Sequence, residues 1–124
     1  MLRVFRLNAI VFTVLRVGAG LLFIEHGVQK LFGMLGGHTE PLTSRLGVAG
    51  VLESVGGLLL IVGLFTRPVA LVLMVEMLVA FATAHFPMGG WPVQNQGELA
   101  LLYALIFAVL AVHGGGPLSI DSRR

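Results

Sequence analysis

The chain of 124 residues is strongly apolar: 56% of its residues are hydrophobic and only 11% are charged. This composition excludes an ordinary soluble fold and indicates a membrane protein with one domain, residues 1–124. The absence of cysteine excludes disulfides, thiolate metal ligands and a cysteine nucleophile. The net charge of +2 is small, and the arginines lie mostly near the ends and at one turn. This pattern favours orientation in a bilayer and not binding to nucleic acid.

Four apolar segments are long enough, or nearly so, to cross a hydrocarbon core, which takes about 20 helical residues. In chain order they are residues 9–32, 46–65, 68–86 and 97–113. A helix satisfies its own backbone in lipid, whereas an open strand cannot. We therefore expect an all-α fold, an integral membrane four-helix bundle with up-and-down topology.

The first segment contains the stretch LLFIEHGVQKLFG, residues 21–33, which places Glu25 and His26 next to each other. Lys30 follows one turn later near the end of the segment, where its ammonium group can snorkel to the interface. Glu25 and His26 cannot snorkel so easily. Because adjacent helical positions point about 100° apart, at least one of the two should face protein. Together they offer a proton acceptor and a hydrogen-bond donor.

Turn and cap signals mark where the later segments begin and end. Arg67 and Pro68 belong to a very tight connection, with the proline in the first turn of the next helix. Asn95 followed by Glu98 resembles a capping box that opens the last segment, and Gly114 follows its end.

The distribution of Lys and Arg predicts that both termini are cytoplasmic. In that orientation Lys30 and Arg45 lie outside, and the connections 33–45 and 87–96 form candidate lids on the outer face. The cytoplasmic side then carries the larger positive charge, from Arg3, Arg6, Arg67, Arg123 and Arg124.

Three glutamates, Glu25, Glu53 and Glu76, fall well inside the apolar segments, and Glu98 lies at the start of the last one. A charge at the bilayer centre costs about 2.5 to 3.5 kcal/mol, so such side chains normally face the bundle interior and pair or titrate. A helical rise of about 1.5 Å per residue places Glu76 near the midplane. Glu53, Glu25 and His26 lie progressively outward, with His85 near the outer end. We expect them to converge on one pocket beneath the outer connections.

Arg16 lies in the inner half of the first segment, and two interpretations of it stay open. It forms a structural ion pair with Glu53 or Glu76, or such a pair also lines a ligand or proton site. We expect no metal site, because no HxxxH or ExxH spacing is present. Fingerprints of nucleotide binding and serine hydrolysis are also absent.

Several motifs together resemble the DoxX family of small integral membrane proteins. They are HGVQKLFG at 26–33, GLFTRPVAL at 63–71, AH at 84–85, GELALLY at 97–103 and GGGPLSID at 114–121. The resemblance implies a four-helix integral membrane fold. It also implies a link to redox complexes, since the family takes its name from a subunit associated with a thiosulfate:quinone oxidoreductase. Thiosulfate turnover belongs to particular branches and is not transferred.

Our first functional hypothesis is a quinone-linked oxidoreductase subunit in the bacterial cytoplasmic (inner) membrane. Quinone is the expected cofactor, and electrons come from a soluble oxidoreductase partner or directly from substrate. The alternative is a non-enzymatic membrane scaffold, or a small transporter or proton pathway that works as a homo-oligomer. The candidate site residues are Glu25, His26 and Glu76 for proton transfer, and Arg16, Glu53 and His85 for the ligand pocket.

Overall fold

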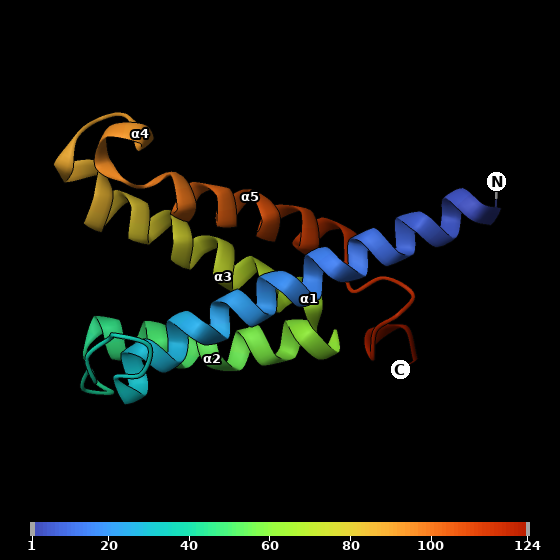
Figure 1. Ribbon diagram of the computed structural model, residues 1–124, viewed down its shortest axis with the longest axis horizontal. Coiled ribbons are helices and arrows are strands. Elements are labelled where there is room, and N and C mark those ends of the chain that lie inside the picture. Colours follow the sequence, from blue (N-terminus) through green and yellow to red (C-terminus); the bar gives the residue numbers. More distant parts are fainter. Residues whose placement is uncertain (1, 124) are drawn as a thin grey trace.

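The computed structural model describes residues 2–123, and every regular element in that range is helical. The four long helices are α1 (Leu2–Phe32), α2 (Arg45–Val62), α3 (Thr66–Ala80) and α5 (Glu98–His113) (Figure 1). A π-helical turn (Phe81–His85) and a 3₁₀ turn (Phe86–Met88) extend α3, a short α4 (Pro92–Asn95) follows, and a last 3₁₀ turn covers Asp121–Arg123.

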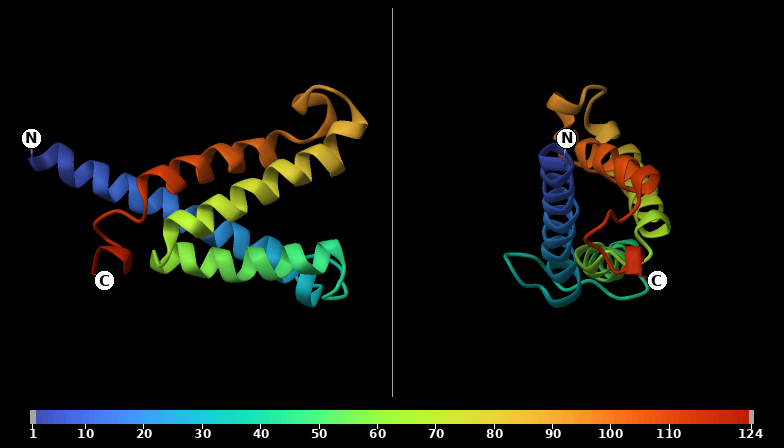
Figure 2. Two further views of the ribbon diagram at one scale, coloured as in Figure 1. Left: turned by 180° about the vertical axis from the view of Figure 1, so that it is seen from behind. Right: turned by 90° about the vertical axis from the view of Figure 1, so that its right-hand side faces the viewer.

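The helices confirm the predicted all-α fold and correspond to the four apolar segments in order. Three of them are long and apolar enough to cross a membrane by length and composition, counting α3 with its extension, whereas α5 is shorter. The largest difference lies in α1, which begins well before residue 9 and projects beyond the rest of the molecule (Figures 1 and 2). The predicted sidedness of the termini stays a prediction.

The helices form two pairs that diverge from each other. Helix α1 packs along α2 and α3 packs along α5, with far less contact between α1 and α5. The pairs meet near the C-terminal segment and separate toward the end that carries α4 and the connection 33–44 (Figures 1 and 2). We call these the closed end and the open end.

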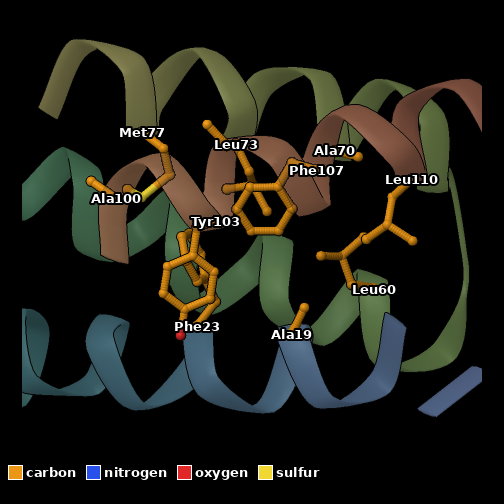
Figure 3. Close-up of a cluster of buried hydrophobic side chains, with 11 residues drawn as sticks. Ala19, Phe23, Leu60, Ala70, Leu73, Met77, Ala100, Tyr103, Phe107 and Leu110 are labelled. Atoms are coloured by element: carbon orange, nitrogen blue, oxygen red, sulfur yellow. The ribbon is translucent and has the colours of Figure 1, made fainter. Parts of the chain in front are cut away.

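The apolar core fills the space where the two pairs meet. Phe23 of α1, Leu60 of α2, Leu73 of α3 and Phe107 of α5 are almost completely buried. The rings of Phe23 and Phe107 pack edge to face with centroids 4.8 Å apart, a favoured geometry for aromatic pairs (Figure 3). This contact links the two helix pairs.

Glycines allow α1 and α2 to approach closely. A Cβ atom added at Gly20 would lie 2.5 Å from the carbonyl oxygen of Gly57, and one added at Gly57 would lie 2.6 Å from the carbonyl oxygen of Gly20. These distances are shorter than van der Waals contact. Only glycine fits at either position, as is typical of closely packed membrane helices.

Arg16 ties the closed end together. Its side chain is only 2% exposed, and Nε donates to the carbonyl of Leu60 at 2.9 Å. Nη2 donates to Leu118 at 3.0 Å and Nη1 donates to Gly115, both in the C-terminal segment. The expected ion pair of Arg16 with a glutamate is therefore wrong. The guanidinium fork is instead suited to several carbonyls at once, including that of Leu60 near the end of α2.

The C-terminal segment also caps α3. Asp121 accepts hydrogen bonds from the backbone N–H groups of Phe65 at 2.8 Å and Thr66 at 2.9 Å. A carboxylate stabilises a helix N-terminus because it satisfies free N–H groups and complements the helix dipole. Gly63 adjoins this contact with φ 72°, and a Cβ there would lie 2.4 Å from Cβ of Ser119. We call Arg16, residues 63–66 and residues 115–121 the terminal clamp.

Candidate functional site

A cavity of about 270 Å³ lies between the two helix pairs toward the open end. Its walls are mainly apolar, with a few charged and polar side chains. Helices α1 and α2 contribute one wall, and α3, its extension, Gln96 and α5 contribute the other. The lining residues are Phe23, His26, Lys30, Glu53, Met77, Ala80, His85, Gln96, Leu99, Ala100 and Tyr103.

An ion pair forms the most polar part of this cavity. The ammonium Nζ of Lys30 lies 2.6 Å from Oε1 and 2.8 Å from Oε2 of Glu53. The Glu53 side chain is 1% exposed and that of Lys30 is 25% exposed. Lys30 therefore has a buried carboxylate of α2 as its partner, which was not predicted from the sequence. Both oxygens of this carboxylate accept from the ammonium and so engage part of its donor capacity.

Glu76 approaches the same ion pair from α3. Its carboxyl group lies close to that of Glu53, and two neighbouring carboxyl groups can share a hydrogen bond only when one of them carries a proton. Oε1 of Glu76 is buried without a hydrogen-bond partner. Glu76 also lines a separate groove of about 340 Å³ with Arg45 and Thr83. The carboxyl pair thus lies between the cavity and this groove.

Aromatic rings form another part of the cavity wall, beside the residues of the ion pair. The ring of His26 meets that of Tyr103 edge to face at 6.1 Å between centroids and that of Phe23 at 6.0 Å. The ring centroids of Tyr103 and Phe23 are 4.7 Å apart, and both residues are buried (Figure 3). This wall suits a flat apolar ligand, because aromatic faces and edges pack well against rings.

His85 enters the cavity from the π-helical turn that extends α3. Its Nδ1 lies 3.2 Å from the carbonyl oxygen of Asn95. Asn95 is itself buried and accepts a hydrogen bond from the N–H of Gly97 at 2.8 Å. The expected capping box of Asn95 with Glu98 is therefore wrong, since Gly97 is the N-cap of α5 and gives no side-chain cap. Single π-helical turns recur at functional sites.

The structure places the six predicted site residues in different surroundings. His26, Glu53 and His85 line the cavity, and Glu76 reaches it through Glu53. Glu25 is exposed and does not line the cavity. Arg16 belongs to the terminal clamp. Within residues 2–123 no three His, Asp or Glu side chains gather as a metal site.

Three lining residues, Lys30, Tyr103 and Gln96, were not among the predicted ligand or proton-transfer groups. A depth argument like the one used for the glutamates could have found Lys30, because it lies level with Glu53 on the antiparallel neighbour. Tyr103 carries a hydroxyl within an apolar helix, which is a signal of a buried polar contact. Nothing in the sequence singles out Gln96, which adopts a left-handed conformation with φ 61° after α4.

The fold and cavity define a helical bundle of the membrane class, with a polar site between two helix pairs. The DoxX family model matches residues 11–86, more than half of the chain. An uncharacterized protein of Haemophilus influenzae is 41% identical over 116 residues, which cover 88% of this chain and 87% of that protein. No solved structure matches the chain. The protein belongs to the DoxX family of membrane proteins.

Proposed function

We propose that the protein is a quinone-linked subunit of a membrane oxidoreductase and that the cavity at its open end holds the quinone head group. The observation that carries this proposal is the Lys30–Glu53 ion pair within a cavity of otherwise mainly apolar walls. Small-molecule sites typically combine apolar walls with a few placed polar groups. A buried ion pair alone is weak evidence for a stabilising role, so a ligand role is a reasonable use for this one.

The side chains present suit a quinone head group. Quinones are flat rings with an oxygen at each side, and Phe23 and Tyr103 offer aromatic packing to such a ring. Lys30 has three N–H donors and Glu53 supplies two acceptor oxygens, which leaves a donor for a ligand oxygen. The cavity volume of 270 Å³ is just below the range of about 300 to 1,000 Å³ for small-molecule sites. It therefore suits one ring, with any apolar tail lying outside.

Proton transfer is the second task of this site in our proposal. A bound quinone supplies electron transfer coupled to proton uptake or release. Glu53 faces the cavity and contacts Glu76, which reaches the groove lined by Arg45. The carboxyl pair can hold a proton and pass it between the two spaces, because carboxyl groups in contact exchange protons along their hydrogen bond. We propose that electrons come from a partner oxidoreductase.

Quantifying bound quinone in the purified, detergent-solubilised protein tests this proposal. We expect the parent to carry quinone, directly or after incubation with an excess, and expect Glu53→Gln and His26→Ala to lose most of it. His38→Ala is the matched control, because His38 lies exposed in the connection before α2. A parent that takes up no quinone under any of these conditions would overturn the proposal.

A proton pathway without redox chemistry is the second candidate function. The specific observation in its favour is the Glu53–Glu76 contact between the cavity and the groove. Proteoliposomes with an internal pH dye test it. Proton flux that needs no quinone and disappears in Glu76→Gln would support this function over the first. Flux no faster than in empty liposomes would eliminate it.

A further inference from the structure

The hydrogen-bonding character of His85 follows from its contact with Asn95. Nδ1 of His85 lies 3.2 Å from the backbone carbonyl oxygen of Asn95. A carbonyl oxygen accepts hydrogen bonds and cannot donate, so Nδ1 must carry the proton in this contact. In the neutral ring the other nitrogen, Nε2, then keeps its lone pair. Nε2 is the one polar atom that His85 has left to offer to the cavity it lines.

The loop around Asn95 holds this arrangement in place. Asn95 is 4% exposed, its Nδ2 donates to the carbonyl of Gly89 at 2.7 Å, and its Oδ1 accepts from Gly97 N at 2.8 Å. The His85 side of the contact is set by the π-helical turn. With both sides fixed, the less common Nδ1–H form of the ring is built into the fold and does not depend on a ligand.

The opposite wall of the cavity has the opposite hydrogen-bonding character. Lys30 can only donate, and Glu53 already engages part of its donor capacity. A ligand between the walls therefore meets a donor at Lys30 and an acceptor at His85. A hydroxyl group satisfies His85, because it brings a proton to Nε2. A carbonyl oxygen at that position would face a lone pair and leave both atoms without a hydrogen bond, which costs free energy beside the mainly apolar walls of the cavity.

We propose that His85 is a specificity-determining residue that selects a ligand with a hydroxyl group, so that the cavity binds the hydroquinone form of the head group more tightly than the quinone form. The inference rests on the proposed function. Sites built to hydrogen-bond a ligand hydroxyl discriminate strongly against analogues that lack it, since their own polar groups are then left unpaired. Lys30 does not discriminate in this way, because both a hydroxyl and a carbonyl oxygen accept its hydrogen bond.

Two measurements on the purified full chain test the inference. Histidine NMR of isotope-labelled protein at about pH 8, where an ordinary histidine is neutral, identifies the protonated ring nitrogen of His85 without any ligand. Its signal is assigned by its loss in His85→Phe. Anaerobic equilibrium dialysis then compares the dissociation constants of decylubiquinol and decylubiquinone. We expect the Nδ1–H form at His85 and at least about tenfold tighter binding of the quinol.

The variants separate specificity from folding. His85→Phe keeps an aromatic ring but removes the acceptor, and His85→Gln keeps a polar group that both accepts and donates. Both should bring the ratio of the two dissociation constants close to one, whereas His38→Phe should keep the parent ratio. The Nε2–H form at His85, or a parent ratio near one, would overturn the inference while leaving quinone binding in place. Failure of both ligands to bind the parent would overturn the proposed function and this inference with it.

Discussion

The closed end and the open end of the bundle both bury charged side chains, but they satisfy them differently. At the closed end Arg16 distributes its donors over backbone carbonyls of α2 and of the C-terminal segment. At the open end Lys30 and Glu53 pair beside a cavity, and Oε1 of Glu76 has no partner. Buried charged groups whose hydrogen bonds are satisfied make a structure rigid, whereas incompletely satisfied ones are available to a ligand or a proton. The closed end also holds an unsatisfied buried group, the hydroxyl Oγ1 of Thr66, but this group is uncharged.

The comparison assigns stability to one end and chemistry to the other. The terminal clamp joins α1, α2, α3 and the C-terminal segment through hydrogen bonds to backbone groups, and these depend on no ligand. The helix pairs are then free to diverge at the open end and leave a cavity between them. Substitutions at the closed end should therefore change mainly the free energy of unfolding, whereas substitutions at the cavity should also change ligand binding.

Replacing Arg16 should have the largest effect on folding. Arg16→Leu removes several hydrogen bonds from a charged donor and leaves buried carbonyls unpaired, so we expect a loss of more than about 4 kcal/mol in unfolding free energy. Thermal unfolding in detergent measures this change. Arg16→Lys keeps the charge without the planar fork and should lose less. Unfolding at the parent temperature in Arg16→Leu would contradict the role of the clamp.

Glu53→Gln should cause the second-largest loss of unfolding free energy, because it leaves the ammonium of Lys30 beside a neutral amide. Removing one member of a buried ion pair costs about 3 kcal/mol or more, since the remaining charge is uncompensated. The same unfolding experiment checks this, with Glu98→Gln as control because Glu98 is exposed. A change as small as that of the control would mean that water already reaches Lys30.

Asp121→Ala should have a moderate effect confined to the closed end. It removes the cap from α3, a change typically worth about 1 kcal/mol. We expect a lower unfolding temperature and an unchanged quinone content. Loss of quinone without loss of stability would contradict the division between the two ends.

Glu25→Gln should have the smallest effect of the series. Glu25 is exposed and outside the cavity lining, and substitutions of this kind usually change stability by less than about 0.5 kcal/mol. Quinone content should stay within the scatter of the parent. A large loss of quinone would restore Glu25 to the site and point to a contact with a ligand or a partner chain.

The sequence was sufficient to predict the helices and part of the site. Apolar length located the four helices, and the constant helical rise placed His26, Glu53 and His85 in the outer part of the bundle, where all three line the cavity. The sequence did not show which side of each helix faces the cavity. Glu25 and His26 are neighbours in the sequence, yet only His26 lines the cavity.

Arg16 shows a second limit of the sequence. Its partners are backbone carbonyls near residues 60 and 115–118, and no side-chain pattern marks a carbonyl as an acceptor. The C-terminal motif GGGPLSID and the turn motif GLFTRPVAL both contributed to the resemblance to the DoxX family. The structure gives them a shared structural reason instead, since Asp121 of the first caps the helix that begins at Thr66 of the second.

The most direct test of the division between the ends is the double variant Lys30→Met with Glu53→Leu. Replacing a buried ion pair by apolar residues of similar volume is often neutral or stabilising, so the variant should unfold at or above the parent temperature. Decylubiquinone binding, measured by equilibrium dialysis on the same sample, should be lost. A folded variant that binds the quinone as tightly as the parent would contradict our account that this ion pair forms the ligand site.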